Sequence, residues 1–213
     1  MERQKVLVII PAFNEEKNIE RVIQKIESVK GDYVYQVDYL VVNDCSKDDT
    51  LKMRKEARRN YVSLPVNLGI GGGMQCGYLY ALEHGYDIAI QMDADGQHDP
   101  GYLDVLVRPV LEGETDMVVG SRFLTKEGFQ SSAARRMGIR FLSRLIRIIC
   151  GVDIKDVTSG FRAVNRDIIQ FFAGDYAQDY PEPESIVACV KNKFTIREVP
   201  VVMYERCGGE SSI

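Results

Sequence analysis

The alternation of short β-branched runs with amphipathic segments in the first half of the chain most constrains the fold. Residues 6–10 form an apolar run closed by Pro11, and apolar residues then recur at helical spacing over 15–29. The predicted strands are 6–10, 39–42, 61–64, 88–92, 117–119 and 195–202, and the predicted helices are 15–29, 48–59, 73–84, 100–111 and 130–150. This order indicates an α/β fold: a Rossmann-like, mostly parallel sheet with helices on both faces.

The composition is typical of a single soluble domain. The chain has 213 residues, of which 45% are hydrophobic and 27% are charged. Because no repeat, low-complexity tract or proline-rich linker divides the sequence, we expect residues 1–213 to form one domain. A net charge of −4 gives no reason to expect a nucleic-acid partner, and the sequence does not indicate an oligomeric state.

The cysteines and the hydropathy pattern indicate a cytoplasmic protein. The five cysteines lie far apart and include no C-x-x-C pair, so we expect reduced thiols rather than disulfides or a zinc site. We expect no leader, because the apolar run at residues 6–10 is too short for one, and no stretch approaches the ~18 apolar residues that a membrane span requires.

Polar and glycine residues follow four predicted strands. The segments are PAFNE at 11–15, NDCS at 43–46, NLG at 67–69 and DADGQHD at 93–99. Each loop alone is open to a purely structural explanation, because strand-to-helix loops are often polar. Since ligands of open α/β sheets bind at the carboxyl ends of the strands, four such segments together predict a ligand site at one edge.

The segment DADGQHDP is the strongest local signal. Asp93 and Asp95 need a cation between them, and their hard oxygens suit Mg²⁺ or Mn²⁺, with Gln97 as a further ligand. Asp99 is expected to cap the helix that opens at Pro100. A calcium EF-hand is excluded, because its pattern does not continue.

The glycine-rich segment 67–77 does not have the dinucleotide-binding spacing. The sixth position of G-x-G-x-x-G is Met74 or Cys76, and the segment follows the third strand rather than the first. We expect these glycines to let the backbone approach a ligand or a neighbouring strand.

Asn14 is expected to cap the helix predicted at 15–29.

Arginines and a few acids mark the second half. Arg122 lies directly after a predicted strand. The turn 156–162 contains an acid, two hydroxyl residues and an arginine. Glu182 and Glu184 flank a proline in an expected turn. In the helix predicted at 130–150, one stripe is basic and the adjoining face is apolar: Arg136, Arg140, Arg144 and Arg147 beside Met137, Phe141, Leu142, Leu145, Ile148 and Ile149. The basic stripe is either a solvated outer face or a surface for anionic head groups at a membrane.

In order, the motifs PAFNEE, VNDCSKDDT, NLGIGGG, DADGQHDP, GSRF, DVTSGFR and the closing EVPV…ER.GGES resemble those of family 2 glycosyltransferases. Among these the chain is most similar to the polyprenyl-phosphate and dolichyl-phosphate glycosyltransferases. The resemblance covers about residues 6–212.

The resemblance implies an inverting enzyme with a GT-A fold, a nucleotide-sugar donor and a divalent metal. It implies a nucleotide pocket lined by Pro11, Ala12, Asn14, Glu15, Gly73, Asp93 and Ala94, with Asp44 on the base. It places Mg²⁺ or Mn²⁺ on Asp93, Asp95 and Gln97. It implies phosphate contacts from Arg122, Arg136, Ser159, Arg162 and Arg206, and acidic groups near the reacting centre at Asp95, Asp156 and Glu184.

Two positions depart from the family pattern. Asn43 stands where the family often has a first aspartate, so a single carboxylate, Asp44, remains for the base. Ile70 stands where the family often has lysine, which removes one expected phosphate or base contact. Members commonly continue into membrane-associating helices after the catalytic domain.

The resulting hypothesis is transfer of a sugar from a nucleotide-sugar to a lipid phosphate at the inner membrane face. A UDP-sugar is favoured because Asp44 could accept from the imide N–H of uracil, although guanine also presents donors. A phosphate acceptor is already largely ionised at pH 7 and needs no base. A hydroxyl acceptor, the first alternative, needs Asp156 or Glu184 as the base. A sugar nucleotidyltransferase is disfavoured, because this chain lacks the glycine- and arginine-rich loop that such enzymes need after the first strand. A nucleotide-binding domain without turnover is the remaining alternative.

Overall fold

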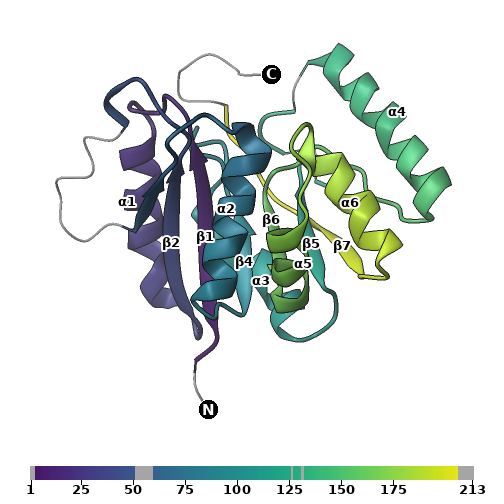
Figure 1. The fold of residues 1–213 in the computed structure, drawn as a ribbon. Coiled ribbons are helices and arrows are strands. Elements are labelled where there is room, and N and C mark those ends of the chain that lie inside the picture. Colours follow the sequence, from purple (N-terminus) through teal and green to yellow (C-terminus); the bar gives the residue numbers. More distant parts are fainter. Residues whose placement is uncertain (1–2, 51–59, 126, 131, 206–213) are drawn as a thin grey trace.

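The computed structural model describes residues 3–50, 60–125, 127–130 and 132–205, which build one seven-stranded sheet in the order β3-β2-β1-β4-β6-β5-β7 (Figure 1). The strands are β1 (Lys5–Ala12), β2 (Gln36–Asn43), β3 (Tyr61–Ser63), β4 (Ile88–Gln91), β5 (Met117–Ser121), β6 (Arg162–Asn165) and β7 (Ile196–Pro200). The helices are α1 (Ile19–Val29), α2 (Gly69–Glu83), α3 (Leu103–Leu111), α4 (Ala133–Cys150), α5 (Arg166–Gly174) and α6 (Pro181–Lys191), with short 3-10 turns at Lys30–Asp32 and Pro100–Tyr102.

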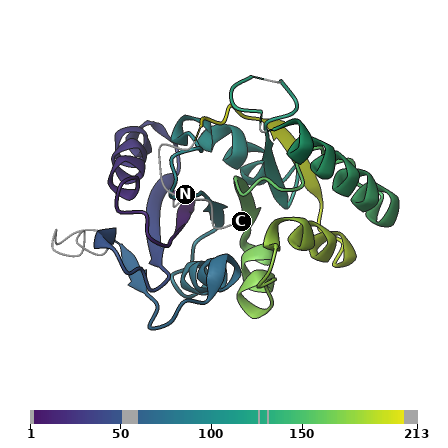
Figure 2. The same ribbon diagram turned by 90° about the horizontal axis from the view of Figure 1, so that it is seen from above.

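The sheet is mixed and mostly parallel, as the sequence predicts. β1 pairs in parallel with β2 and β4, while β6 runs antiparallel between β4 and β5. Alternate side chains of β1 point to opposite faces of the sheet. Val6 and Val8 pack with α1 and α3, and Leu7 and Ile9 pack on the face that carries α2, α4, α5 and α6. Figure 2 shows helices on both sides of the sheet.

The sequence prediction missed β6, α5 and α6. β6 has only four residues, and its polar ends, Arg162 and Asn165, hide the period of a strand. The expected turn at Glu182 and Glu184 is wrong, because both residues lie in the first turn of α6, which opens with Pro181. Most of the helix predicted at 48–59 lies outside the described residues.

The predicted starts of two helices were wrong. α1 begins at Ile19, four residues later than expected, and Asn14 does not cap it because Asn14 adopts a left-handed conformation with φ +56° in the preceding loop. α2 begins at Gly69, so the glycine segment is helix rather than turn.

The glycines of α2 permit close packing of the helix. A Cβ atom on Gly77 would lie 2.2 Å from Cγ2 of Ile9 in β1, and one on Gly71 would lie 2.2 Å from the carbonyl oxygen of Ala177. The expected close backbone approach is therefore confirmed, and it brings α2 onto β1 and onto the segment before α6. In the described part of the chain, no helix combines the length and the apolar character needed to span a bilayer.

Candidate active site

The loops after β1 and β2 are linked by hydrogen bonds at the carboxyl edge of the sheet. The backbone N–H of Asn14 donates to Oγ of Ser46 at 3.0 Å, and Oδ1 of Asn14 accepts from the N–H of Lys47 at 2.9 Å. The N–H of Glu15 donates to Oγ1 of Thr50 at 3.0 Å. These contacts between two loops hold Asn14 and Glu15 beside the end of β2.

The remaining residues of the expected nucleotide pocket lie at the same edge. Pro11 and Ala12 end β1, and the carbonyl of Ala12 accepts from the N–H of Asp44 at 2.9 Å. A Cβ atom on Gly73 would lie 3.7 Å from Cβ of Pro11, so the first turns of α2 face the end of β1. Ala94 is buried after β4.

Asp44 has a structural task that the sequence did not reveal. Its carboxylate accepts from the N–H of Leu68 at 2.7 Å and from the N–H of Gly69 at 2.8 Å, and the residue is buried. A carboxylate at this position satisfies backbone donors at the start of α2 and complements its dipole. The geometry therefore explains Asp44 without a base ligand, and the preference for uridine loses its support from this residue.

A buried histidine positions Asp93 after β4. Since Nδ1 of His98 accepts from the N–H of Asp93 at 3.0 Å, its proton lies on Nε2, which is 3.7 Å from Oδ2 of Asp93. The imidazole stacks on Phe161 with centroids 4.7 Å apart. Burial lowers the pKa of His98 to about 4, so the ring is neutral at pH 7 and presents an N–H to the carboxylate.

The expected metal ligands surround the turn after β4. Asp93, Asp95 and Gln97 are half-buried, and Oδ1 of Asp95 accepts from the N–H of Gln97 at 2.9 Å. No group of three His, Cys, Asp or Glu residues in the described ranges is arranged to hold a metal ion alone. The oxygen donors fit a hard divalent ion that takes its other ligands from a diphosphate and water.

Gly160 leaves room for the Asp93 carboxylate. A Cβ atom on Gly160 would lie 3.1 and 3.2 Å from the two oxygens of Asp93 and 3.2 Å from Nε2 of Gln91. Such distances are tighter than ordinary van der Waals contact. Glycine at 160 thus allows the 156–162 turn to pack against the carboxylate.

Arg122 and Asp156 form a buried, two-point ion pair. Nε of Arg122 lies 2.7 Å from Oδ2 of Asp156, and Nη2 lies 2.7 Å from Oδ1. Asp156 is completely buried and also accepts from the backbone N–H of Arg122 at 3.1 Å. Burial acts to lower the pKa of Arg122, but the hydrogen bonds and charge of Asp156 raise it, so the guanidinium stays charged. With both oxygens engaged, Asp156 is poorly placed to act as a base.

The geometry favours a positioning role for Arg162 over the expected phosphate contact. Its Nε donates to the carbonyl of Ser159 at 2.6 Å, Nη1 to the carbonyl of Glu182 at 2.7 Å, and Nη2 to the carbonyl of Val157 at 3.0 Å. The residue is buried. Ser159 is buried as well, and its Oγ accepts from a backbone N–H within the same turn, so it too is explained by local structure.

Glu182, rather than the predicted Glu184, faces the carboxyl end of β4. Oε1 of Glu182 accepts from Nε2 of Gln91 at 3.4 Å, whereas Glu184 is exposed. Gln91 is completely buried and accepts from the hydroxyl of Tyr176 at 3.3 Å. One feature of the sequence could have indicated the role of Glu182. Because proline is common at the first position of a helix, Pro181 could have predicted a helix start with Glu182 in its first turn.

Arg136 lies apart from this cluster, in a groove of about 680 Å³ along α4. The groove is lined by Phe123, Gln130, Arg136, Arg140, Ser143, Arg144, Arg147, Asp153, Ile154 and Lys155. Nε2 of Gln130 donates to the carbonyl of Arg122 at 3.0 Å, so the groove begins next to the buried ion pair. Arg206 lies outside the described residues.

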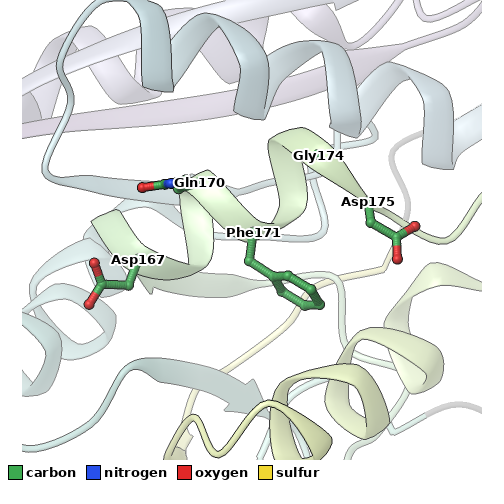
Figure 3. Close-up of a pocket in the computed structure, with 5 residues that line it drawn as sticks. All are labelled: Asp167, Gln170, Phe171, Gly174 and Asp175. Carbon is green, nitrogen blue, oxygen red and sulfur yellow. The ribbon is translucent and has the colours of Figure 1, made fainter.

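A second cavity, of about 470 Å³, lies on α5 (Figure 3). It is lined by Asp167, Gln170, Phe171, Gly174 and Asp175. None of the residues predicted to bind a ligand lines this cavity, so it does not belong to the candidate site.

Comparison with known proteins places the chain in a family. Residues 7–172 match the model of the family described as glycosyl transferase family 2. A UDP-N-acetylglucosamine–dolichyl-phosphate N-acetylglucosaminyltransferase of Methanococcus voltae is 29% identical over 92% of this chain and 84% of its own length. A polyprenol monophosphomannose synthase of Mycolicibacterium smegmatis is 29% identical over 99% of this chain and 81% of its own length.

The solved structures agree on the fold. Glucosyl-3-phosphoglycerate synthase from Mycobacterium tuberculosis, in complex with Mn²⁺, UDP-glucose and phosphoglyceric acid, superposes with a TM-score of 0.73. It is 22% identical, and the match covers 98% of this chain and 72% of that protein. The seven-stranded mixed sheet described above is therefore the GT-A arrangement. The chain belongs to glycosyl transferase family 2, and it is a glycosyltransferase with the GT-A fold.

Proposed function

We propose that this glycosyltransferase moves a sugar from a UDP-sugar to a polyprenyl phosphate, with inversion at the anomeric carbon and with the help of Mg²⁺ or Mn²⁺. The observation that carries the acceptor assignment is the arginine-lined groove that begins beside Arg122. An anionic head group suits such a groove, because guanidinium groups bind phosphate oxygens with two parallel hydrogen bonds. The relatives named for dolichyl-phosphate and polyprenol substrates support the same acceptor class.

On this proposal residues 1–213 act as one domain whose first half holds the donor. Pro11, Asn14 and Glu15 line the nucleotide side, and the relative named for UDP-N-acetylglucosamine supports uridine. Asp93, Asp95 and Gln97 would hold Mg²⁺ or Mn²⁺, which would supply positive charge to the leaving diphosphate.

The chain's own residues then position the acceptor and the donor sugar. An acceptor phosphate oxygen forms the new bond to the anomeric carbon while the bond from that carbon to the nucleoside diphosphate breaks, so one displacement inverts the centre. Positioning and electrostatic stabilisation provide most of the rate. Glu182, which faces the end of β4 from the first turn of α6, is placed to bind hydroxyls of the donor sugar, and Arg162 fixes it through its backbone carbonyl.

The state of Asp156 favours a phosphate acceptor over a hydroxyl acceptor. A hydroxyl needs a carboxylate with a lone pair directed at it, whereas both oxygens of Asp156 accept from Arg122. A phosphate monoester is already largely ionised at pH 7, because its second pKa is about 6. The reaction on a lipid phosphate therefore needs no base from the protein.

The test is to mix the protein with Mn²⁺ or Mg²⁺, a short polyprenyl phosphate and a panel of UDP- and GDP-sugars, and to detect lipid-linked sugar by mass spectrometry. One UDP-sugar is expected to give a product, and Asp95→Ala is expected to abolish it. Asp99→Ala is the matched control, because Asp99 accepts from the N–H of Gly101 as a helix cap. Transfer only to hydroxyl acceptors, or nucleotide binding without any transfer, would contradict the proposal.

A further inference from the structure

α4 stands at the outer edge of the molecule and packs on it along one narrow side. Only Ile139 and Ile146 of this helix are buried, and α6 is its neighbouring helix (Figure 1). The ends of α4 are well defined, because Oγ of Ser132 accepts from the N–H of Arg135 and Gly151 ends the helix with φ +74°. Leu142 and Cys150 are half-buried beside this pair, and most of the remaining helix surface is exposed.

That outward surface carries an unusual amount of apolar side chain. Five residues, called here the α4 apolar stripe, are exposed by 71%, 72%, 41%, 75% and 63% respectively: Met137, Phe141, Leu145, Ile148 and Ile149. Their spacing places them on one side of the helix, away from the buried pair. Single exposed apolar residues need no explanation, but a continuous exposed stripe of large ones marks an interaction surface.

The side of α4 next to the stripe is strongly basic. The helix contains five arginines and no aspartate or glutamate. Four of these arginines line the groove described above, where Lys155 adds a further cation, and Arg147 pairs with Asp153 at 3.6 Å. The apolar stripe and the basic groove are thus two adjoining strips of the same helix.

We infer that α4 docks flat on an anionic lipid bilayer, with the apolar stripe in the acyl boundary and the groove arginines level with the phosphate head groups. A basic amphipathic helix with large apolar residues on its other side binds bilayers in this way, and arginine stems extend their charged ends to the interface. A second copy of the chain fits less well. A symmetric contact through α4 would bring ten arginines together with no acid on either helix.

The role of this docking in catalysis rests on the proposed function. If the acceptor is a lipid phosphate, docking through α4 explains how a membrane-bound acceptor reaches the site. The groove starts where Gln130 bonds to the carbonyl of Arg122 and continues along α4. Docking through α4 would bring the head-groups to this groove. A polyprenyl phosphate can then reach the buried ion pair while its chain stays in the bilayer.

The first measurement is co-sedimentation of the full chain with phosphatidylcholine vesicles, with and without phosphatidylglycerol. We expect binding at least about tenfold stronger with phosphatidylglycerol, and weaker binding as salt rises. The double variant Phe141→Asp/Ile148→Asp is expected to lose at least about tenfold in partitioning. Val34→Asp is the matched control, because Val34 is 78% exposed but lies before β2, and this variant is expected to bind like the wild type.

Three results would overturn the inference. One is an absence of binding to the anionic vesicles, and another is an equal loss of binding in Val34→Asp. The third is a dimer in sedimentation velocity that the α4 double variant dissolves, since the stripe would then be a contact between copies. Circular dichroism and thermal unfolding check that the variants remain folded.

Failure of the docking and failure of the proposed function are distinguishable. If the wild type transfers sugar to a short, water-soluble prenyl phosphate but ignores vesicles, the docking falls alone. If it binds anionic vesicles as expected but transfers no sugar to prenyl phosphates, the proposed function falls and the docking surface stands.

Discussion

The two halves of the site are built by different kinds of contact. In the first half, the loops after β1 and β2 are joined by single hydrogen bonds between backbone and short polar side chains, such as Asn14 with Lys47 and Glu15 with Thr50. In the second half, two buried guanidinium groups organise the chain, Arg122 through Asp156 and Arg162 through three carbonyls. The first half therefore rests on many weak contacts, and the second on a few strong ones.

This difference separates binding from folding. A loop hydrogen bond contributes about 1 kcal/mol to stability, so losing one is expected to disturb the ligand site more than the fold. A buried charge that loses its partner carries its whole desolvation cost. Changes around β5 and β6 should therefore act on stability first, and changes around β1 and β4 on ligand binding first.

The largest effect is expected from Asp156→Asn. The guanidinium of Arg122 would remain buried without its counter-charge, and breaking such a pair costs about 3–5 kcal/mol. Urea unfolding measures this loss. The matched control is Asp104→Asn, whose partner Arg108 is exposed, and there we expect little change in the free energy of unfolding, because exposed ion pairs contribute little. If the two variants lose equally small amounts of unfolding free energy, the second half does not depend on its buried ion pair, and the proposed contrast between the halves is wrong.

A second prediction concerns His98, which belongs to the first half but is buried like the groups of the second. Its folded pKa of about 4 lies below the ordinary 6.5, so between these values the unfolded chain takes up a proton that the folded chain refuses. The free energy of unfolding is therefore not reduced by His98 above pH 6.5, and it decreases as the pH falls from 6.5 towards 4. By this shift, the loss reaches about 3 kcal/mol.

The measurement for His98 is the free energy of unfolding against pH, in EDTA, for the wild type and His98→Gln. The stability advantage of the wild type is expected to shrink by up to about 3 kcal/mol between pH 6.5 and 4. His84→Gln serves as the control for loss of an exposed histidine. A difference between wild type and His98→Gln that stays constant with pH would show that His98 is not held neutral by burial.

The contrast between the halves also explains what the sequence could predict. The first half has regular apolar periods and turns with clear glycine and proline signals, so the strands from β1 to β5 and the helices α1 to α3 were found, with errors at their ends. In the second half the sequence predicted only α4 and β7. Local pattern decides such elements. β6 is defined instead by pairing with β4 and β5, far away in sequence. Its buried Arg162 donates to two nearby carbonyls and also to the carbonyl of Glu182 in α6, a contact that depends on how the two segments meet.

The same limit applies to the candidate site. The sequence identified Asp93, Asp95 and Gln97 as a group, since they share one turn. It could not show that Asp44 bonds to the start of α2, nor that Glu182 rather than Glu184 faces β4, because both depend on how separate segments meet. The exposure of the apolar stripe was equally hidden, since an amphipathic pattern does not reveal which apolar side is covered.

The smallest effect is expected where the two halves touch, at Gly160→Ala. The added Cβ would press on both oxygens of Asp93, which must shift by a few tenths of an ångström, while the flexible carboxylate spares the fold. We expect binding of Mn²⁺ with UDP to weaken about tenfold, or about 1.4 kcal/mol, by calorimetry, with little change in unfolding. Gly138→Ala on α4 is the control, because its Cβ meets nothing within 4 Å and alanine favours a helix. If Gly160→Ala binds Mn²⁺ and UDP like the wild type, Asp93 does not hold the metal, and the ligand set must be sought around Asp95.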